Sequence, residues 1–177
     1  MNPYHWMIHE ATHQLNAEVA QLNLAKWLDE GLADYFATSR IRDGQLMVGT
    51  IDPQTYPVWW MDDMATVTTL QACVDNGSVI PLRAIITDRG GPSMNKNFNL
   101  YYLHWWTLTH YLFENSKLRE PAMKLVEHEG TLEAFEKDVG SVDSVSADWF
   151  RHVRMIKKAL AGHNSEFLAT GRLSSDE

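Results

Sequence analysis

The feature that most constrains this chain is the pentapeptide His9-Glu10-Ala11-Thr12-His13, close to its start. Two histidines four positions apart lie one turn above each other on the same face of a helix. Their imidazoles can then reach one metal ion at Zn–N distances of about 2.0–2.1 Å. The glutamate between them is placed to bind a water on that metal and take its proton. The pattern therefore predicts a helix that supplies two ligands of a zinc site.

A motif this short also arises by accident. With eight His and eleven Glu in the chain, the HExxH pattern is expected in roughly 2% of shuffled sequences. Two histidines on a helix can equally be partly buried residues with local hydrogen bonds. The motif alone leaves both interpretations open, and the next segment decides between them.

The segment Trp27–Phe36, WLDEGLADYF, is the second element, and sixteen residues separate its Glu30 from His13. It resembles the WLxEGxAxYF segment of the gluzincins, the thermolysin-like zinc metallopeptidases. The likeness is greatest to the peptidase-MA group, which includes the M1 aminopeptidases, whose connecting turn is slightly longer. In those families the glutamate of this segment is the third zinc ligand. A plain amphipathic helix with an exposed Asp29/Glu30 pair is the alternative interpretation.

The resemblance implies a zinc-dependent peptidase. One zinc ion is held by His9, His13 and Glu30, and a zinc-bound water activated by Glu10 attacks a peptide carbonyl. The expected partner is a peptide or protein substrate. Two alternatives stay open: a zinc-binding structural or interaction module with weak or no activity, and hydrolysis of a non-peptide amide.

Other residues of the second helix support this interpretation. Gly31 and Ala33 are small, as expected if this helix packs closely on the first so that Glu30 can reach the metal. Asp34 lies one turn after Glu30 on the same face. Related gluzincins place an acidic residue there, which accepts a hydrogen bond from a zinc-bound imidazole and fixes its tautomer. A solvated surface aspartate is the alternative for Asp34.

The sequence excludes the metzincin class, and it shows no clear copy of the M1 exopeptidase signature. A metzincin needs Gly at position 16 and His at position 19, and the chain has Asn16 and Val19. The GxMEN signature of the M1 exopeptidases lies upstream of HExxH. The segment Gly91–Asn95 is only faintly similar to it, lies downstream and lacks the glutamate.

A donor for the developing oxyanion is expected on a downstream helix. The segment Tyr101–His110 resembles the YxQxWxLxHFL helix of MA-like proteins, which places Tyr102 at the matching tyrosine. His104 is the second candidate, and His110 aligns with a family histidine whose role the sequence does not give. An aromatic stripe at helical spacing is more often core than catalytic.

Other histidines and tryptophans carry weaker signals. No partner pattern accompanies four histidines, which we interpret as surface or incidental residues: His5, His128, His152 and His163. Four tryptophans could shape an apolar substrate cleft, but core packing is favoured for them: Trp59, Trp60, Trp105 and Trp106.

The periodicity predicts a mainly α fold. Zincin-like catalytic helices are followed by a helical C-terminal part, with little or no sheet. The expected helices cover 3–20, with Pro3 in the first turn, and 27–40, 61–74, 81–87, 97–115, 120–128, 131–139 and 147–160. Residues 45–50 form a strand or extended arm, 51–60 an ordered loop and 140–146 a linker. Residues 1–162 are expected to form one metallopeptidase domain, and 163–177 a polar, disordered tail.

Composition excludes several partners. The formal net charge is -8, and no Lys/Arg cluster argues for nucleic acid. No run approaches the roughly 20 apolar residues of a membrane span, and no signal peptide is recognisable. Cys73 is the single cysteine, which excludes a disulfide framework and a Cys-based zinc site. The cellular compartment and the oligomeric state stay open.

One departure from the gluzincin pattern stands out. Those enzymes usually place a twisted sheet before the HExxH helix, and its edge strand pairs with an extended substrate. Eight residues precede His9, too few for a sheet. We expect either a piece of a longer protein or a reduced form that carries the zinc helices without that subdomain.

Overall fold

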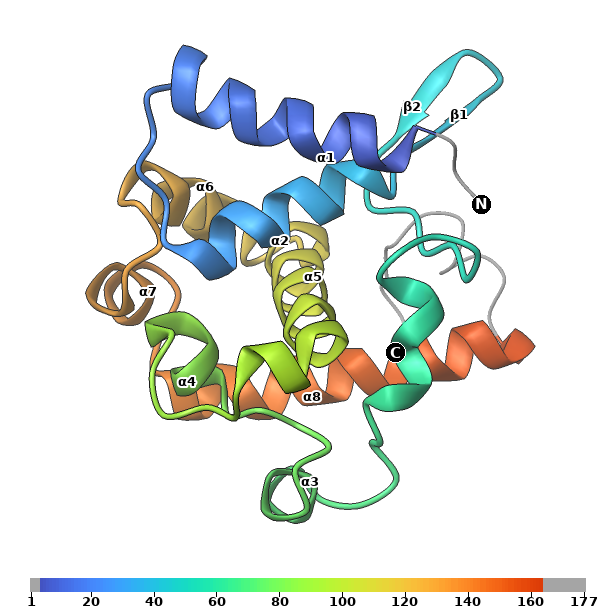
Figure 1. Cartoon of the computed structure of the whole chain (residues 1–177), viewed down its shortest axis with the longest axis vertical. Helices are drawn as coiled ribbons and strands as arrows, with labels where there is room; N and C mark the ends of the chain where they lie inside the picture. The colour runs from blue at the N-terminus through green and yellow to red at the C-terminus, as the bar shows by residue number, and fades with distance from the viewer. Residues whose placement is uncertain (1–3, 164–177) are drawn as a thin grey trace.

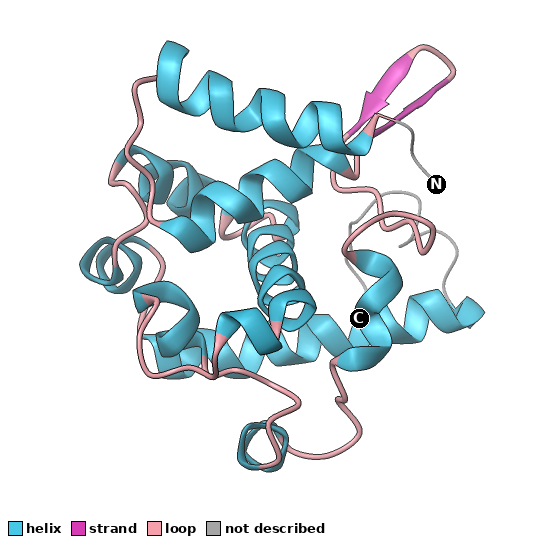
Figure 2. Ribbon diagram, in the orientation of Figure 1, coloured by secondary structure: helices cyan, strands magenta, loops and turns pink. Residues whose placement is uncertain are grey.

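Helices dominate the structure. The computed structural model describes residues 4–163; Pro3 and residues 164–177 of the expected tail lie outside them. Within that range the predicted mainly α fold with little sheet is confirmed, because the strands form a single two-stranded hairpin (Figure 2). No helix of residues 4–163 combines the length and apolar character needed to cross a membrane.

The regular elements follow each other with short connections. In chain order they are α1 (His5–Gln14), η1 (Leu15–Val19), α2 (Lys26–Ala37), β1 (Arg40–Arg42), β2 (Gln45–Met47), η2 (Val58–Asp63), α3 (Leu70–Asp75), α4 (Leu82–Thr87), η3 (Met94–Lys96), α5 (Phe98–Glu114), α6 (Arg119–Glu127), α7 (Leu132–Asp138), α8 (Val142–Lys158) and η4 (Ala159–His163). The antiparallel hairpin pairs Ile41 with Leu46. It replaces the end of the second predicted helix, which stops at Ala37.

The long aromatic helix α5 forms the centre of the core. Figure 1 shows α1 above α2, with α5 running behind α2 toward α8. Trp105 and Trp106 of α5 are 1% and 0% exposed, so core packing is the correct interpretation for both. Trp59 and Trp60, in contrast, are each 39% exposed. Burying several large aromatic side chains fixes α2 and α8 on α5.

Two predicted boundaries are wrong. The predicted helix 61–74 is a regular α-helix only from Leu70, because Thr69 adopts an extended conformation and caps α3 with its side chain. The predicted linker 140–146 is the start of α8. Ser141 caps that helix by accepting a hydrogen bond from the Ser144 amide, and the helix then buries Val142 and Val145.

Gly31 permits close contact between α2 and α5. A Cβ at this position would lie 2.8 Å from the carbonyl oxygen of Trp105 and 2.2 Å from Oγ1 of Thr109. The prediction that this small residue serves the contact with the first helix is wrong for Gly31. The glycine instead allows α2 to approach the core, while the other face of α2 points toward α1.

Replacement of Gly31 by alanine is expected to destabilise the fold. Alanine favours a helix by about 0.5–1 kcal/mol over glycine, but overpacking against a fixed backbone costs about 1–3 kcal/mol. We therefore expect a net loss in the free energy of unfolding, measured by urea denaturation. A Gly31→Ala/Thr109→Ala double variant should recover only part of the loss, because the Trp105 carbonyl remains. A stability equal to wild type for Gly31→Ala would contradict this packing.

Candidate metal centre

The three side chains predicted as zinc ligands lie together between α1 and α2. His9 and His13 project from successive turns of α1, and Glu30 projects from α2. The two Nε2 atoms are 3.1 Å apart, so that they can share one proton or bind one cation. The Oε2 atom of Glu30 lies 3.5 Å from Nε2 of His9 and 3.7 Å from Nε2 of His13.

This triangle of donor atoms fits a tetrahedral cation. Four ligands at about 2.0–2.1 Å from zinc stand about 3.3–3.4 Å from one another, which falls between the shortest and longest edges observed. Oε2 of Glu30 is buried and has no hydrogen-bond partner among residues 4–163. Burying a carboxylate oxygen without a hydrogen-bond partner destabilises the folded protein. A cation shared with the two imidazoles would compensate for this loss of free energy. The nitrogen and carboxylate donors are also those that zinc accepts.

Each histidine has a carboxylate behind it. Nδ1 of His9 lies 2.9 Å from Oδ1 of Asp34, and Nδ1 of His13 lies 2.8 Å from Oδ2 of Asp29. The second oxygen of Asp29 accepts a hydrogen bond of 2.9 Å from the side-chain amide of Asn16. Both contacts leave Nε2 of the histidine facing the centre of the triangle. Asp29 was missed as a site residue, although it directly precedes the predicted third ligand.

The electrostatics of the cluster favour positive charge. Burial lowers the pKa of His9, but the carboxylates of Asp34 and Glu30 more than offset it and raise the pKa to about 9. Burial raises the pKa of Asp34 to about 6, with the hydrogen bond to His9 acting in the opposite direction. The pKa of Glu30 is lowered despite its burial, because the neighbouring imidazoles and a tyrosine hydroxyl stabilise the carboxylate. A proton or a metal cation is therefore attracted to His9.

Tyr102 reaches the cluster from α5. Its ring is stacked on that of His9 at a centroid distance of 6.4 Å, and its hydroxyl helps to lower the pKa of the Glu30 carboxyl. Glu10 is exposed and takes no part in the triangle. Burial raises the pKa of Tyr102, and the negative charges of Glu30, Asp34 and Glu10 add to the shift.

Tyr56 is a second tyrosine at the site, and no pattern in the sequence indicated it. Its ring contacts four others, those of His5, Trp6, Trp59 and Tyr102, at centroid distances of 5.7, 5.2, 6.0 and 5.4 Å. The hydroxyl is buried without a hydrogen-bond partner in the described part of the chain. Burial raises its pKa, and the negative charge of Asp34 adds to the shift. The predicted ordered loop thus contributes to the site.

The two candidate histidines of α5 do not belong to the site. His104 is fully buried; its Nδ1 donates to the Leu100 carbonyl, and its Nε2 accepts from the Ile80 amide. His110 donates from Nε2 to the Gly49 carbonyl and accepts at Nδ1 from His152. His104 is therefore excluded as the oxyanion donor, because both of its nitrogens are used by the backbone.

Two histidines interpreted as surface or incidental are buried instead. His152 is 6% exposed beside His110, and His5 is 3% exposed one turn before His9. His5 forms a second group of possible metal donors with His9 and Asp34, in which all three residues are buried. The two groups share His9, whose Nδ1 already bonds to Asp34. His128, in contrast, is largely exposed and lies 2.7 Å from a carboxylate oxygen of Asp138.

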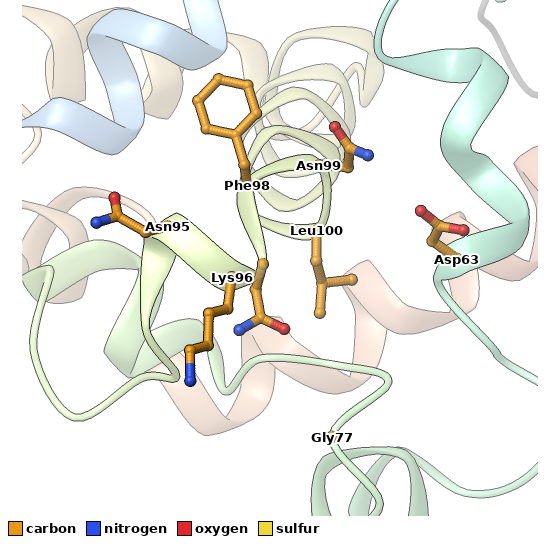
Figure 3. A pocket seen from close by; sticks show the side chains of 8 residues that line it. Asp63, Gly77, Asn95, Lys96, Phe98, Asn99 and Leu100 are labelled. Carbon is orange, nitrogen blue, oxygen red and sulfur yellow. The ribbon is translucent and has the colours of Figure 1, made fainter.

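A separate pocket lies at the start of α5. Eight residues line it: Asp63, Gly77, Asn95, Lys96, Asn97, Phe98, Asn99 and Leu100. Figure 3 shows the ring of Phe98 pointing away from the Lys96 side chain. That ring packs on Tyr102 at a centroid distance of 4.5 Å. Phe98 therefore separates this polar pocket from the aromatic side of the metal centre.

Fold and site together define a helical protein with a histidine–carboxylate centre that can hold a metal. Residues 5–129 match the family model described as "Protein of unknown function (DUF1570)", and the chain belongs to this family. No curated protein and no solved structure matches it. The matched range begins with α1 and includes Tyr102 and every residue of the triangle, so the candidate centre lies wholly within the family's domain.

We predict that the protein loses stability in acid because α5 contains two buried histidines. Burial lowers the pKa of His104 and of His110 from 6.5 to about 4, so the folded chain keeps both neutral where the unfolded chain protonates them. Stability is therefore complete above about pH 6.5 and falls as the pH decreases toward 4. At pH 5 each residue should cost about 2 kcal/mol.

The measurement is urea unfolding at pH 7 and pH 5 in the presence of a chelator. The difference between the two pH values should be smaller by about 2 kcal/mol in a His104→Gln variant than in wild type. Each protein is compared with itself at the two pH values. The general destabilisation of the variant therefore cancels, and so does the contribution that the metal centre makes in both proteins. An equal difference in both proteins would show that His104 is not held neutral.

Proposed function

We propose that this protein is a zinc-dependent peptidase of the gluzincin type. The observation that carries the proposal is the triangle of His9 Nε2, His13 Nε2 and Glu30 Oε2, with edges of 3.1, 3.5 and 3.7 Å. The residues come from the two segments whose sequences resemble the gluzincin motifs. The buried, unpaired oxygen of Glu30 supports a cation as the occupant.

A zinc ion held by these residues supplies a Lewis acid, which polarises a carbonyl and increases the acidity of water. The chain's own groups perform the remaining tasks. Asp34 and Asp29 fix the tautomers of the two histidines so that both Nε2 atoms face the centre. Glu10, exposed beside His9, takes the proton of the attacking water and returns it to the leaving amine.

Zinc binding is expected to be stoichiometric and to depend on the triangle. The wild-type protein should bind one zinc ion, measured by elemental analysis and by competition with a chromophoric chelator. Asp34→Asn should weaken binding by about 10–100-fold, as for other residues that orient a ligand, and Glu30→Gln should weaken it further. Glu18→Gln is the control, since Glu18 is exposed and bonds only to Gln14 within the described residues. Zinc-free wild type, or unchanged affinity in Glu30→Gln, would refute the site.

Peptide cleavage should depend on Glu10. A general base contributes about 10²–10⁴-fold to such a reaction, so Glu10→Gln should lower the cleavage of a peptide library by this factor. Its zinc content should remain that of wild type, because the triangle does not include Glu10. Glu18→Gln again serves as the matched control on the same helical segment. Cleavage by Glu10→Gln at the wild-type rate would exclude this mechanism.

A zinc-binding module without peptidase activity is the second candidate. It is supported by the limited sheet, since the described residues contain one exposed two-stranded hairpin in place of a sheet beside α1. Under this alternative, zinc raises the melting temperature of the protein, and no peptide of the library is cleaved by wild type. The zinc-binding and peptide-cleavage experiments above therefore distinguish the peptidase from the zinc-binding module.

A further inference from the structure

The metal centre contains an unequal pair of supporting carboxylates. Both oxygens of Asp29 are used, one by His13 and the other by the side-chain amide of Asn16. Asp34 is 0% exposed and uses only Oδ1, which bonds to His9. Its Oδ2 has no hydrogen-bond partner in the described part of the chain. A fully buried carboxylate requires donors at both oxygens more strongly than a half-exposed one.

A matching donor lies beside Asp34. The hydroxyl of Tyr56 is also buried without a partner among residues 4–163, and after burial the charge of Asp34 contributes most to its raised pKa. The two residues meet at His5, whose ring lies 5.7 Å from that of Tyr56 and whose Nε2 lies 3.7 Å from Oδ1 of Asp34. The hydroxyl of Tyr102 acts on Glu30 instead, where it helps to lower the pKa of the carboxyl. A buried donor and a buried acceptor, each without a hydrogen-bond partner in the described residues, fit a bridge by one ordered water.

The chain fixes Tyr56 relative to Asp34. Arg40 begins β1, three residues after the end of α2, the helix that carries Asp34. Its Nη2 lies 2.6 Å from a carboxylate oxygen of Asp52. The same guanidinium donates to Oγ1 of Thr55, the residue before Tyr56. The loop that carries the tyrosine is thus attached to the helix that carries the carboxylate.

We propose that Tyr56 is a positioning residue of the metal centre, whose hydroxyl donates to one ordered water that in turn donates to Oδ2 of Asp34. It acts on Asp34 as Asn16 acts on Asp29. The resulting series Tyr56–Asp34–His9 holds the imidazole with Nε2 facing the other ligands. The inference rests on the proposed zinc site, but it does not require peptidase activity.

A double-mutant cycle on zinc affinity tests the inference. Zinc dissociation constants are measured for wild type, Tyr56→Phe, Asp34→Asn and the double variant. Tyr56→Phe removes only the hydroxyl and should weaken binding by about 3–10-fold, less than the loss expected for Asp34→Asn. In the Asp34→Asn background the same change should have no further effect, because the carboxylate through which Tyr56 acts is absent.

Tyr102→Phe provides the matched control, since its hydroxyl acts on Glu30, whose pKa it helps to lower. Its effect should therefore add to that of Asp34→Asn. The inference is overturned if Tyr56→Phe binds zinc with wild-type affinity. This holds also if the variant lowers only kcat, because Tyr56 would then act on the substrate and not on the metal centre. Additive effects of Tyr56→Phe and Asp34→Asn would also overturn it. A wild-type protein that binds no zinc refutes the proposed function itself, which is a distinguishable result.

Discussion

The arrangement of the site depends on α2, which is packed on both sides. One face presents Trp27, Leu28 and Gly31 to the interior, where the glycine lets the helix approach the backbone of α5. The opposite face carries three carboxylates toward α1. Because packing against α5 fixes the position of α2, the carboxylates are fixed as well, and the two histidines of α1 are oriented against them.

Much of the metal centre could be predicted because its spacing is local. His9 and His13 lie four residues apart on one helix, and Glu30 and Asp34 lie four apart on another, so helical periodicity alone brings each pair to one face. The resemblance to gluzincins then indicated that the two faces meet. Tyr56 could not be found in this way, since it lies in an irregular loop and reaches the site only through the fold.

The histidines of α5 show the limit of reading chemistry from a motif. His104 and His110 lie on the same helix as Tyr102, and nothing in their spacing separates a ligand from a core residue. The structure separates them by backbone partners, the Ile80 amide and the Gly49 carbonyl, which lie 24 and 61 residues away in sequence. Such long-range hydrogen bonds satisfy a buried imidazole without any functional role.

The attachment of α1 has a different physical basis from that of the other helices. Its buried side chains are the polar His5, His9 and Thr12, whereas Trp6 and Met7 are 53% and 63% exposed. Hydrophobic burial therefore contributes little to the docking of α1. Hydrogen bonds to the carboxylates of α2 hold the helix in place instead. A cation at the proposed site would bind two ligands from α1 and one from α2, so the free energy of its binding would contribute to the docking of α1. At the proposed site, α1 would therefore be the element that depends most on the metal, whereas packing on α5 holds α2 in place.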